Sequence, residues 1–372
     1  MLDVIVRGGT VQICQKINRT PGKGILRSHL INWCKMAKIL FYCHDEKSNL
    51  ETFEYYKQDI DALRALGHEV IICTKYSEIP FNYDAMFIWW WTYALWPVLL
   101  SRMLKKPCII TGVYNFRFPE GFEGKDYFRR PYWQRILIRK AAGLCTLNLF
   151  INQHELEGCS KYFRLRNSRY YPCVIHNDYL NRPSTQRSKA LFNLAWSGKE
   201  NLIRKGIPEL LYAVRLLKDE GVEVHLNLAG LEGDGTDYLL KMIEQLQINN
   251  EVSYLGMISR ADKINLLRTC EIYVQPSHYE GFGLATAEAM GCGACVIICD
   301  VGAVREVVGD SGFYVSPGSP EELAKAIKQL LYDDTMRHKL QTSAYQRAND
   351  CFTFDKKLES LKNYLLDIGI IS

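Results

Sequence analysis

The chain has 372 residues, of which 48% are hydrophobic and 23% charged, with a formal net charge of +5. This length suits two domains better than one core, and the charge is too small to indicate a nucleic-acid-binding protein. Its thirteen cysteines show no repeated spacing, which indicates small core residues in a reducing cytoplasm and not a disulfide framework. Cys292 and Cys295 form a C-x-x-C, but no second pair lies at zinc-like spacing, so no metal site is expected.

The first 35 residues show neither a sustained hydrophobic period nor the apolar core of a signal peptide. They are expected to be an extension outside the core, or the product of a mis-set start. A Rossmann-like pattern opens at Met36, with a strand over 37–43, a helix over 50–66 and a second strand over 69–74.

The most apolar run of the chain, residues 85–100, reads AMFIWWWTYALWPVLL. It is shorter than the roughly 20 residues that a membrane-spanning helix needs, and Pro97 interrupts it. The run therefore predicts a buried strand over 86–90 followed by a helix, with the next strand over 108–111.

Residues 112–140 are both aromatic and basic. Five cations, Arg129, Arg130, Arg135, Arg139 and Lys140, are interleaved with Tyr127, Phe128, Tyr132 and Trp133. The mixture suits a surface lying against anionic headgroups or an acceptor. A packed amphipathic helix with its charges in water fits equally well, and both interpretations stay open.

A polar, turn-rich segment over 170–189 is the candidate linker between domains. Before this linker the pattern predicts a strand over 144–151. After it, the pattern predicts a strand over 190–196, a loop over 200–204, a helix from about 206, strands over 222–229 and 251–256, and a last helix over 354–367. Gly230-Leu-Glu-Gly-Asp-Gly235 has the order G-x-x-G-x-G, which is a weak dinucleotide signal. Strands alternating with helices in two halves predict an α/β protein with two Rossmann-like domains.

One stretch, residues 271–306, carries the strongest functional signal. A strand over 272–274 ends at Pro276, and a helix begins near Leu284, so Glu280 lies just before the helix and Glu288 about two turns inside it. Small residues before a helix N-terminus create a phosphate-type anion site, because the first N–H groups are unpaired. Carboxylates at both ends would bracket a nucleotide sugar. The alternative is that Glu280 caps the helix and Glu288 is a solvated helix residue.

The run from Glu280 to Met290, with the following strand and Gly302-Ala-Val-Arg-Glu306, resembles the donor-binding signature of the retaining glycosyltransferases of family 4. The resemblance implies the GT-B fold, with two Rossmann-like domains facing each other across a cleft. It also implies that Glu280 faces the donor sugar, that Glu288 holds the ribose, and that a diphosphate meets the N–H groups near the helix start. Those groups belong to Phe282, Gly283 and Leu284, and Gly281 precedes them.

Two basic positions resemble the Gly-Arg…Lys-Gly pattern of the same family. Gly198-Lys199 and Arg204-Lys205 would supply the cations that neutralise the donor diphosphate. Lys199 stands where arginine is usual, which removes a bidentate phosphate contact and leaves Lys205 as the stronger candidate. A solvated basic turn is the alternative.

The expected domains are 36–178 for the acceptor, 179–352 for the nucleotide sugar, and 353–372 as a helix crossing back to the first domain. The expected activity is retaining transfer of a sugar from a nucleoside-diphosphate donor to an acceptor hydroxyl, in polysaccharide or glycolipid synthesis, with Glu280 and Lys205 as catalytic residues. No metal or other cofactor is expected, because no Asp-x-Asp has a metal-site context.

The acceptor domain departs from the family at two places. Residues 112–115 lack the usual histidine, and residues 44–47 replace the usual glycine-rich loop. A sugar-nucleotide epimerase, a glycosyl phosphorylase and a catalytically silent nucleotide-sugar-binding protein therefore stay open as alternatives. The expected partners are the donor, a glycan or lipid-linked acceptor and anionic lipid, with no nucleic acid, and the expected location is the cytoplasm with peripheral contact to the inner face of the membrane.

Overall fold

The computed structural model describes residues 2–7, 10–15, 36–114, 126–180, 187–194 and 198–371. The chain divides into two compact units, Met1–Cys34 and Lys35–Ser372. In the first unit, β1 (Leu2–Arg7) and β2 (Thr10–Gln15) pair as an antiparallel hairpin, which the sequence pattern does not predict. That residues 1–35 lie outside the core stays a prediction.

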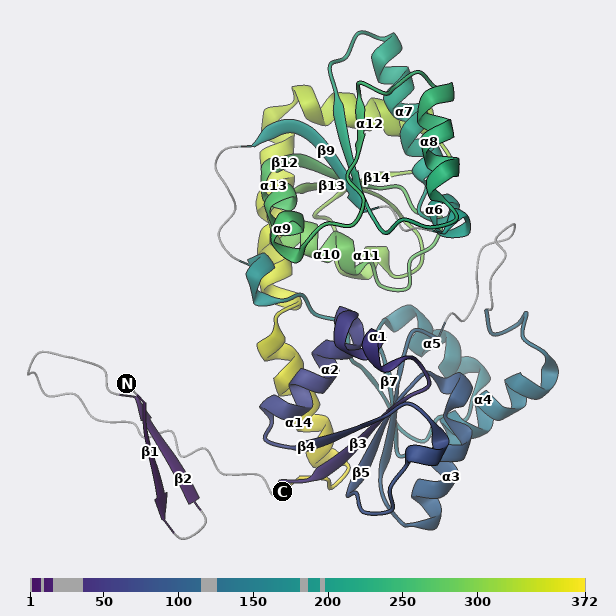
Figure 1. Ribbon diagram of the computed structural model, residues 1–372, viewed down its shortest axis with the longest axis vertical. Helices are drawn as coiled ribbons and strands as arrows, with labels where there is room; N and C mark the ends of the chain where they lie inside the picture. The colour runs from purple at the N-terminus through teal and green to yellow at the C-terminus, as the bar shows by residue number, and fades with distance from the viewer. Residues whose placement is uncertain are drawn as a thin grey trace, which may run out of the picture. The chain divides into compact units, whose positions relative to one another are not determined.

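Two six-stranded parallel sheets organise the second unit, and each is flanked by helices (Figure 1). The first sheet, with its helices, is called the N-domain here, and its strand order is β4-β3-β5-β6-β7-β8. Its elements are β3 (Lys38–Cys43), α1 (Lys47–Thr52), α2 (Glu54–Ala65), β4 (Glu69–Cys73), β5 (Ala85–Trp89), α3 (Leu95–Met103), β6 (Cys108–Gly112), α4 (Tyr132–Leu144), β7 (Leu147–Phe150), α5 (Gln153–Tyr162) and β8 (Ser168–Tyr170), with 3-10 turns at Tyr76–Glu78, Trp91–Tyr93 and Asn177–Leu180.

The second sheet and its helices form the C-domain, with the strand order β11-β10-β9-β12-β13-β14. Its elements are β9 (Ser188–Leu194), α6 (Lys199–Arg204), α7 (Ile207–Asp219), β10 (His225–Ala229), α8 (Thr236–Gln245), β11 (Val252–Tyr254), α9 (Arg260–Thr269), β12 (Cys270–Gln275), α10 (Leu284–Gly291), β13 (Cys295–Cys299), α11 (Val304–Val308), β14 (Phe313–Val315), α12 (Pro320–Tyr332) and α13 (Asp334–Cys351). The expected α/β architecture with two Rossmann-like domains is confirmed.

The strand order fixes where each domain can bind a ligand. In an open parallel sheet, ligands bind beyond the carboxyl ends of the strands, where the order reverses direction, because consecutive connections leave to opposite sides there. The reversal lies between β3 and β5 in the N-domain and between β9 and β12 in the C-domain.

Two local expectations are wrong. The single helix over 50–66 is two helices, because extended Phe53 ends α1 and begins α2. The loop over 200–204 is helical, as α6. Gly206 then turns the chain into α7 with φ +69°, and a Cβ there would lie 2.0 Å from the Pro276 carbonyl oxygen, so only glycine fits. Part of the predicted linker, 181–186, and of the basic segment, 115–125, lies outside the described residues.

The cysteines and the last helix follow expectation. Between residues 36 and 371, the eleven cysteines whose side chains the structure describes are unpaired, and all of them but Cys351 are buried. α14 (Phe354–Asp367) has the predicted bounds and lies beside α2, in the lobe that holds the N-domain sheet (Figure 1). The Lys357 ammonium lies 2.8 Å from the Asp59 carboxylate, and both side chains are buried. The Trp89 indole donates a hydrogen bond of 2.9 Å to the same carboxylate.

Replacing Lys357 with Met should therefore loosen α14 from the N-domain. Asp59 would be left buried without its cation, and such a loss typically costs about 3–5 kcal/mol of unfolding free energy. Urea unfolding measures this cost. Lys362→Met, at an exposed position of the same helix, is the matched control and should change the free energy little. Equal unfolding free energies for the two variants would show that the ion pair between Lys357 and Asp59 does not hold α14 on the N-domain.

Candidate functional site

The predicted site residues gather at the strand-order reversal of the C-domain. β12 ends at Gln275, because Pro276 has no N–H to continue the ladder. The loop that follows runs across the carboxyl end of the sheet and enters α10 at Leu284. The turn after β13 supports this loop: a Cβ on Gly302, at φ +55°, would lie 2.0 Å from the Glu280 carbonyl oxygen, which also accepts from the Ala303 N–H.

Glu280 is buried and anchored by a directed chain of hydrogen bonds. Tyr273 donates from its hydroxyl to Gln275 Oε1 at 2.6 Å, and Gln275 Nε2 donates to Ser277 Oγ at 2.9 Å. The Ser277 hydroxyl then donates to Glu280 Oε1, also at 2.9 Å. All four residues are at most 6% exposed. Every donor points towards the carboxylate, so the chain stabilises Glu280 in its ionised form.

Lys205 and Arg204 bring positive charge to the same carboxylate. The Lys205 ammonium, only 7% exposed, forms an ion pair with Glu280 Oε1. Arg204 donates to the Tyr279 carbonyl oxygen at 2.9 Å. Burial alone raises the pKa of Glu280, but the two cations and the Ser277 hydroxyl outweigh it and hold the pKa below its ordinary value. With Oε1 occupied, Oε2 is the oxygen with spare capacity for a ligand.

Not every predicted cation joins this cluster. Lys199 begins α6 after the N-cap Gly198, is exposed, and lies with its ammonium 4.8 Å from the centre of the Tyr238 ring. The structure therefore brings Lys205, Arg204 and Glu280 together and places Lys199 on a neighbouring surface.

The start of α10 supplies unpaired N–H groups beside Glu280. Gly283 is the N-cap with φ +92°, and its side-chain-free position leaves the N–H groups near Leu284 open. Phe282 is buried and packs edge-on against Phe352 at 5.6 Å, while Gly281 lies where a Cβ would be 2.7 Å from Val113. Such a helix start favours an anionic group, through its N–H groups and its dipole.

Glu288 is the fifth residue of α10, one turn inside the helix and not two as predicted. It is 4% exposed, which rules out a solvated helix residue. Both of its carboxylate oxygens lie 3.0 Å from the ammonium of Lys263, on α9. The sequence pattern does not single out Lys263. The only available signal is the Ser259–Asp262 cap, which fixes where α9 begins.

A cavity of about 390 Å³ adjoins the ion pair between Glu288 and Lys263. It is lined by Thr52, Glu54, Leu194, Ala229, Gly230, Leu231, Met257, Ile258, Ser259, Arg260 and Lys263. Its walls therefore combine the carboxyl ends of β9 and β10 with the start of α9. Glu54 of the N-domain forms an ion pair with Arg260 of the C-domain, so the cavity is bounded by both domains.

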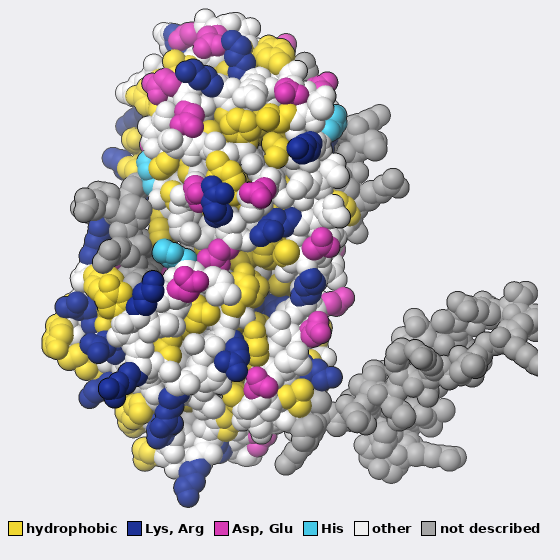
Figure 2. Space-filling model, turned by 180° about the vertical axis from the view of Figure 1, so that it is seen from behind, with side chains coloured by type: hydrophobic (Ala, Val, Ile, Leu, Met, Phe, Trp, Pro, Cys, Tyr) yellow, Lys and Arg dark blue, Asp and Glu magenta, His cyan; other side chains and the backbone are white. Residues whose placement is uncertain are grey.

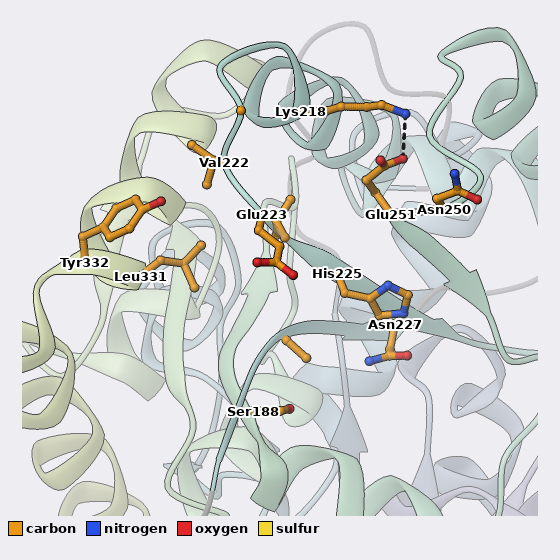
Figure 3. A pocket seen from close by; sticks show the side chains of 13 residues that line it. Ser188, Lys218, Val222, Glu223, His225, Asn227, Asn250, Glu251, Leu331 and Tyr332 are labelled. Carbon is orange, nitrogen blue, oxygen red and sulfur yellow. Dashed lines mark hydrogen bonds and ion pairs between the residues drawn. The ribbon is translucent and has the colours of Figure 1, made fainter.

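Another cavity, of about 850 Å³, lies at the opposite end of the C-domain sheet (Figure 3). Ser188 and His225, which begin β9 and β10, line it, and Lys218 pairs with Glu251 across its rim at 3.0 Å. None of the predicted site residues lines this cavity. It is therefore separate from the site built around Glu280.

Further contacts between the domains reach the loop of Glu280. The Asn152 amide donates to the Gly281 carbonyl oxygen at 2.8 Å, while its own side-chain oxygen caps α5. Glu306 accepts from the backbone N–H groups of Gln153 and His154 at 2.7 and 2.8 Å. A C-domain carboxylate thus caps an N-domain helix. The sequence placed Glu306 in the family-like turn but gave no sign of its partner.

Comparisons with known proteins agree with this geometry. The family model described as Glycosyl transferases group 1 matches residues 199–347. The chain is 35% identical over 169 residues to O-antigen chain mannosyltransferase B of Escherichia coli, covering 43% of this chain and 44% of that protein. It is 28% identical over 159 residues to N,N'-diacetylbacillosaminyl-diphospho-undecaprenol alpha-1,3-N-acetylgalactosaminyltransferase of Campylobacter jejuni, covering 42% and 39%. The matched parts span less than half the length of each relative.

Two solved structures resemble the fold over most of its length. HepE of Anabaena, crystallised with UDP and glucose, has a TM-score of 0.71 at 18% identity and covers 88% of this chain and 99% of that one. Sucrose-phosphate synthase of Thermosynechococcus elongatus has a TM-score of 0.69 at 16% identity, with coverages of 90% and 99%. Residues 199–347 are therefore similar to the Glycosyl transferases group 1 family, in a chain whose two Rossmann-like domains have the GT-B fold.

Proposed function

We propose that the protein is a retaining glycosyltransferase, which moves a sugar from a nucleoside-diphosphate donor to an acceptor hydroxyl in the synthesis of a cell-surface glycan. One observation carries the proposal: Glu280 and Glu288 lie on either side of the α10 N-terminus, and each is paired with a lysine, Glu280 with the buried Lys205 that follows α6 and Glu288 with the half-buried Lys263 of α9. The names of the relatives, two of which transfer mannose or N-acetylgalactosamine, support the same class of reaction.

In this proposal, different residues of the site bind the diphosphate, the sugar and the ribose of the donor. The diphosphate is expected at the start of α10, close to Lys205 and Arg204, while the sugar lies against Glu280 Oε2. The ribose is expected at Glu288 and Lys263, beside the cavity that Gly230 and Arg260 line. Negative charge grows on the diphosphate as the sugar leaves, so fixed cations and N–H groups stabilise the transition state more than the bound donor. In this proposal they make a metal ion unnecessary, so a chelator should leave transfer unchanged.

The N-domain presents a surface that fits an anionic membrane, where a lipid-linked acceptor would lie. Five large side chains of α3 and α4 are exposed: Trp96, Leu99, Met103, Tyr132 and Trp133. Exposed cations lie on or beside the same helices: Arg102, Lys105, Arg129, Arg139 and Lys140. These ten residues are called the α3–α4 face, and Figure 2 shows dark blue and yellow side chains gathered there, at the lower left. Arg130 and Arg135, also predicted for this surface, are half-buried.

Apolar rings that enter the headgroup region, together with lysines and arginines that attract anionic lipid, are the usual basis of peripheral membrane binding. We therefore propose that the protein works at the cytoplasmic side of a membrane. Within the described ranges, none of the helices combines the length and the apolar character that crossing a bilayer requires.

Glu288→Ala should weaken donor binding by roughly 1.5–3 kcal/mol, the usual worth of a hydrogen bond to a charged group. Calorimetry with UDP-, GDP- and ADP-sugars measures the loss for whichever donor binds. Glu359→Ala, at an exposed position of α14, is the control and should bind as the wild type does. If the two variants have the same affinity, the ribose assignment is wrong; if no nucleotide sugar binds the wild type, the proposed activity is wrong.

Ser277→Ala should destabilise the protein in a pH-dependent way. The folded-state pKa of Glu280 is lowered, so its stabilisation is present above the unfolded-state pKa and is lost as the pH falls through the folded-state value. Removing the Ser277 donor should cost about 1.5–3 kcal/mol near pH 7 and progressively less as Glu280 takes up a proton. Urea unfolding across this range is the measurement.

The control for this variant is Ser311→Ala. Ser311 is also buried, but its hydroxyl bonds the neutral Ser343 hydroxyl at 2.7 Å. Its loss should cost about 0.5–1.5 kcal/mol at every pH. A pH-independent cost for Ser277→Ala would show that the hydroxyl does not stabilise the ionised carboxylate.

Replacing Arg139 and Lys140 with Gln should reduce sedimentation with phosphatidylglycerol vesicles, by on the order of 1 kcal/mol for each cation. Trp96→Ser with Trp133→Ser should reduce it as well, but with little dependence on salt, because apolar burial is not screened. Lys325→Gln with Lys339→Gln, exposed in the C-domain, should have no effect. A wild type that stays in the supernatant at low salt would refute membrane binding by the α3–α4 face.

A further inference from the structure

The strand-order reversal of the N-domain, between β3 and β5, carries a second set of polar and aromatic groups. β3 ends at Cys43 and leads into His44 and Asp45, and β5 ends at Trp89 and leads into Trp90. Asp45 and Trp90 therefore stand on the two sides of the position where an open parallel sheet binds its ligand.

Trp90 is held in a backbone conformation that side chains rarely adopt. Its φ is +76°, one of three positive values outside glycine among the described residues. For a bulky residue this conformation is strained by on the order of 1–3 kcal/mol and persists only where the surroundings enforce it. Glycine would adopt this conformation without strain. A tryptophan at this position therefore has a conformational cost, which its side-chain contacts must offset.

One hydroxyl links the two sides. The Tyr56 hydroxyl, from α2, accepts a hydrogen bond of 2.7 Å from Trp90 Nε1 and donates one of 2.8 Å to Asp45 Oδ2. Tyr56 is 1% exposed, whereas Asp45 and Trp90 are partly exposed. The bridge thus fixes the orientation of the indole and the carboxylate from below and leaves both of them accessible.

The spare bonding capacity of these groups defines what they can bind. Asp45 Oδ1 accepts from the Glu46 N–H and the Asn49 amide, both at 2.8 Å, and Oδ2 accepts from Tyr56. A carboxylate has about four acceptor sites, so one remains on Oδ2 for a ligand hydroxyl. The indole N–H of Trp90 is already used, which leaves its ring as an apolar surface.

These properties select a neutral sugar over a phosphate. A pyranose offers both a hydroxyl edge, which donates to a carboxylate, and a face of C–H groups, which packs against an aromatic ring. A phosphate offers no donor when fully ionised, and the negative charge of Asp45 repels it. Asp45 also lines a cavity of about 840 Å³, which runs from His44–Lys47 to the end of β4, on the side of β3 opposite to Trp90.

We propose that Asp45 and Trp90 form a pyranose-binding site at the N-domain strand-order reversal, in which Trp90 is the apolar platform and Asp45 Oδ2 accepts from a sugar hydroxyl. This inference rests on the proposed function: the sugar bound at this site is part of the acceptor, so the acceptor carries a sugar residue that contacts Asp45 and Trp90. This site would set acceptor specificity, separately from the donor residues of the C-domain.

The test is fluorine NMR of the full chain labelled with 5-fluorotryptophan, which places a reporter at each of the seven tryptophans. Trp90→Phe identifies the Trp90 resonance, and Trp96→Phe identifies that of an exposed tryptophan outside the site. The probes are the methyl glycosides of mannose, glucose, galactose and N-acetylglucosamine, with inorganic phosphate in a parallel titration. At least one glycoside should shift the Trp90 resonance, in a saturable way, and leave that of Trp96 unchanged.

Asp45→Asn keeps the shape of the side chain and removes the charge, and it should weaken that glycoside roughly tenfold or more. If no glycoside moves the Trp90 resonance, or if Asp45→Asn binds with wild-type affinity, the site is overturned. A shift produced by phosphate alone would overturn the choice of a sugar. Calorimetry with nucleotide sugars on the same samples separates the two proposals. Donor binding without glycoside binding refutes only this site. Glycoside binding without donor binding refutes only the proposed activity.

Discussion

The buried ion pair between Lys205 and Glu280 is the constraint around which the C-domain site is built. Removing both charges from water is costly, and their attraction offsets that cost only when their remaining hydrogen-bonding groups are satisfied. The structure meets this condition with the Ser277 hydroxyl on one side and the chain through Gln275 and Tyr273 behind it. Close packing at Gly206 and Gly302 then fixes the backbone on which the pair depends.

This rigid C-domain loop is also a contact point for the N-domain. Asn152 bonds the Gly281 carbonyl, and Glu306 caps α5, so two hydrogen-bonding links join α5 to the segments that flank Glu280. On another side, Glu54 and Arg260 pair at the cavity beside Lys263. Any change in the distance between the domains must break or bend these contacts. The loop of Glu280 is therefore mechanically coupled to the N-domain.

The two domains use the same topology for different chemistry. At the C-domain reversal the groups are cations, N–H donors and carboxylates, which suit a charged diphosphate and its sugars. At the N-domain reversal lie a partly exposed indole and a partly exposed carboxylate, bridged by a tyrosine hydroxyl. The family model matches only within the C-domain.

The fold class and much of the candidate site could be predicted from the sequence, because they depend on signals between neighbouring residues. Buried parallel strands are continuous apolar runs, and α10 and α14 carry their own start and stop signals, so the α/β class, the two domains and the bounds of α14 follow from neighbouring residues. The motif of Glu280 and Glu288 is likewise contained in nine consecutive positions. Short-range errors came where local signals were weak, as at extended Phe53 and in the short helix α6.

The partners of those residues were decided only by the tertiary structure. Lys263 reaches Glu288, Glu306 reaches α5, and Tyr56 joins Asp45 to Trp90 across separations that no sequence period encodes. The sequence by itself determined which groups are chemically able to bind a nucleotide sugar, because side-chain chemistry and helix starts are local properties. Which of them meet, which are buried and which keep an oxygen free for a ligand depended on how two sheets pack their helices, and that is a property of the folded chain alone.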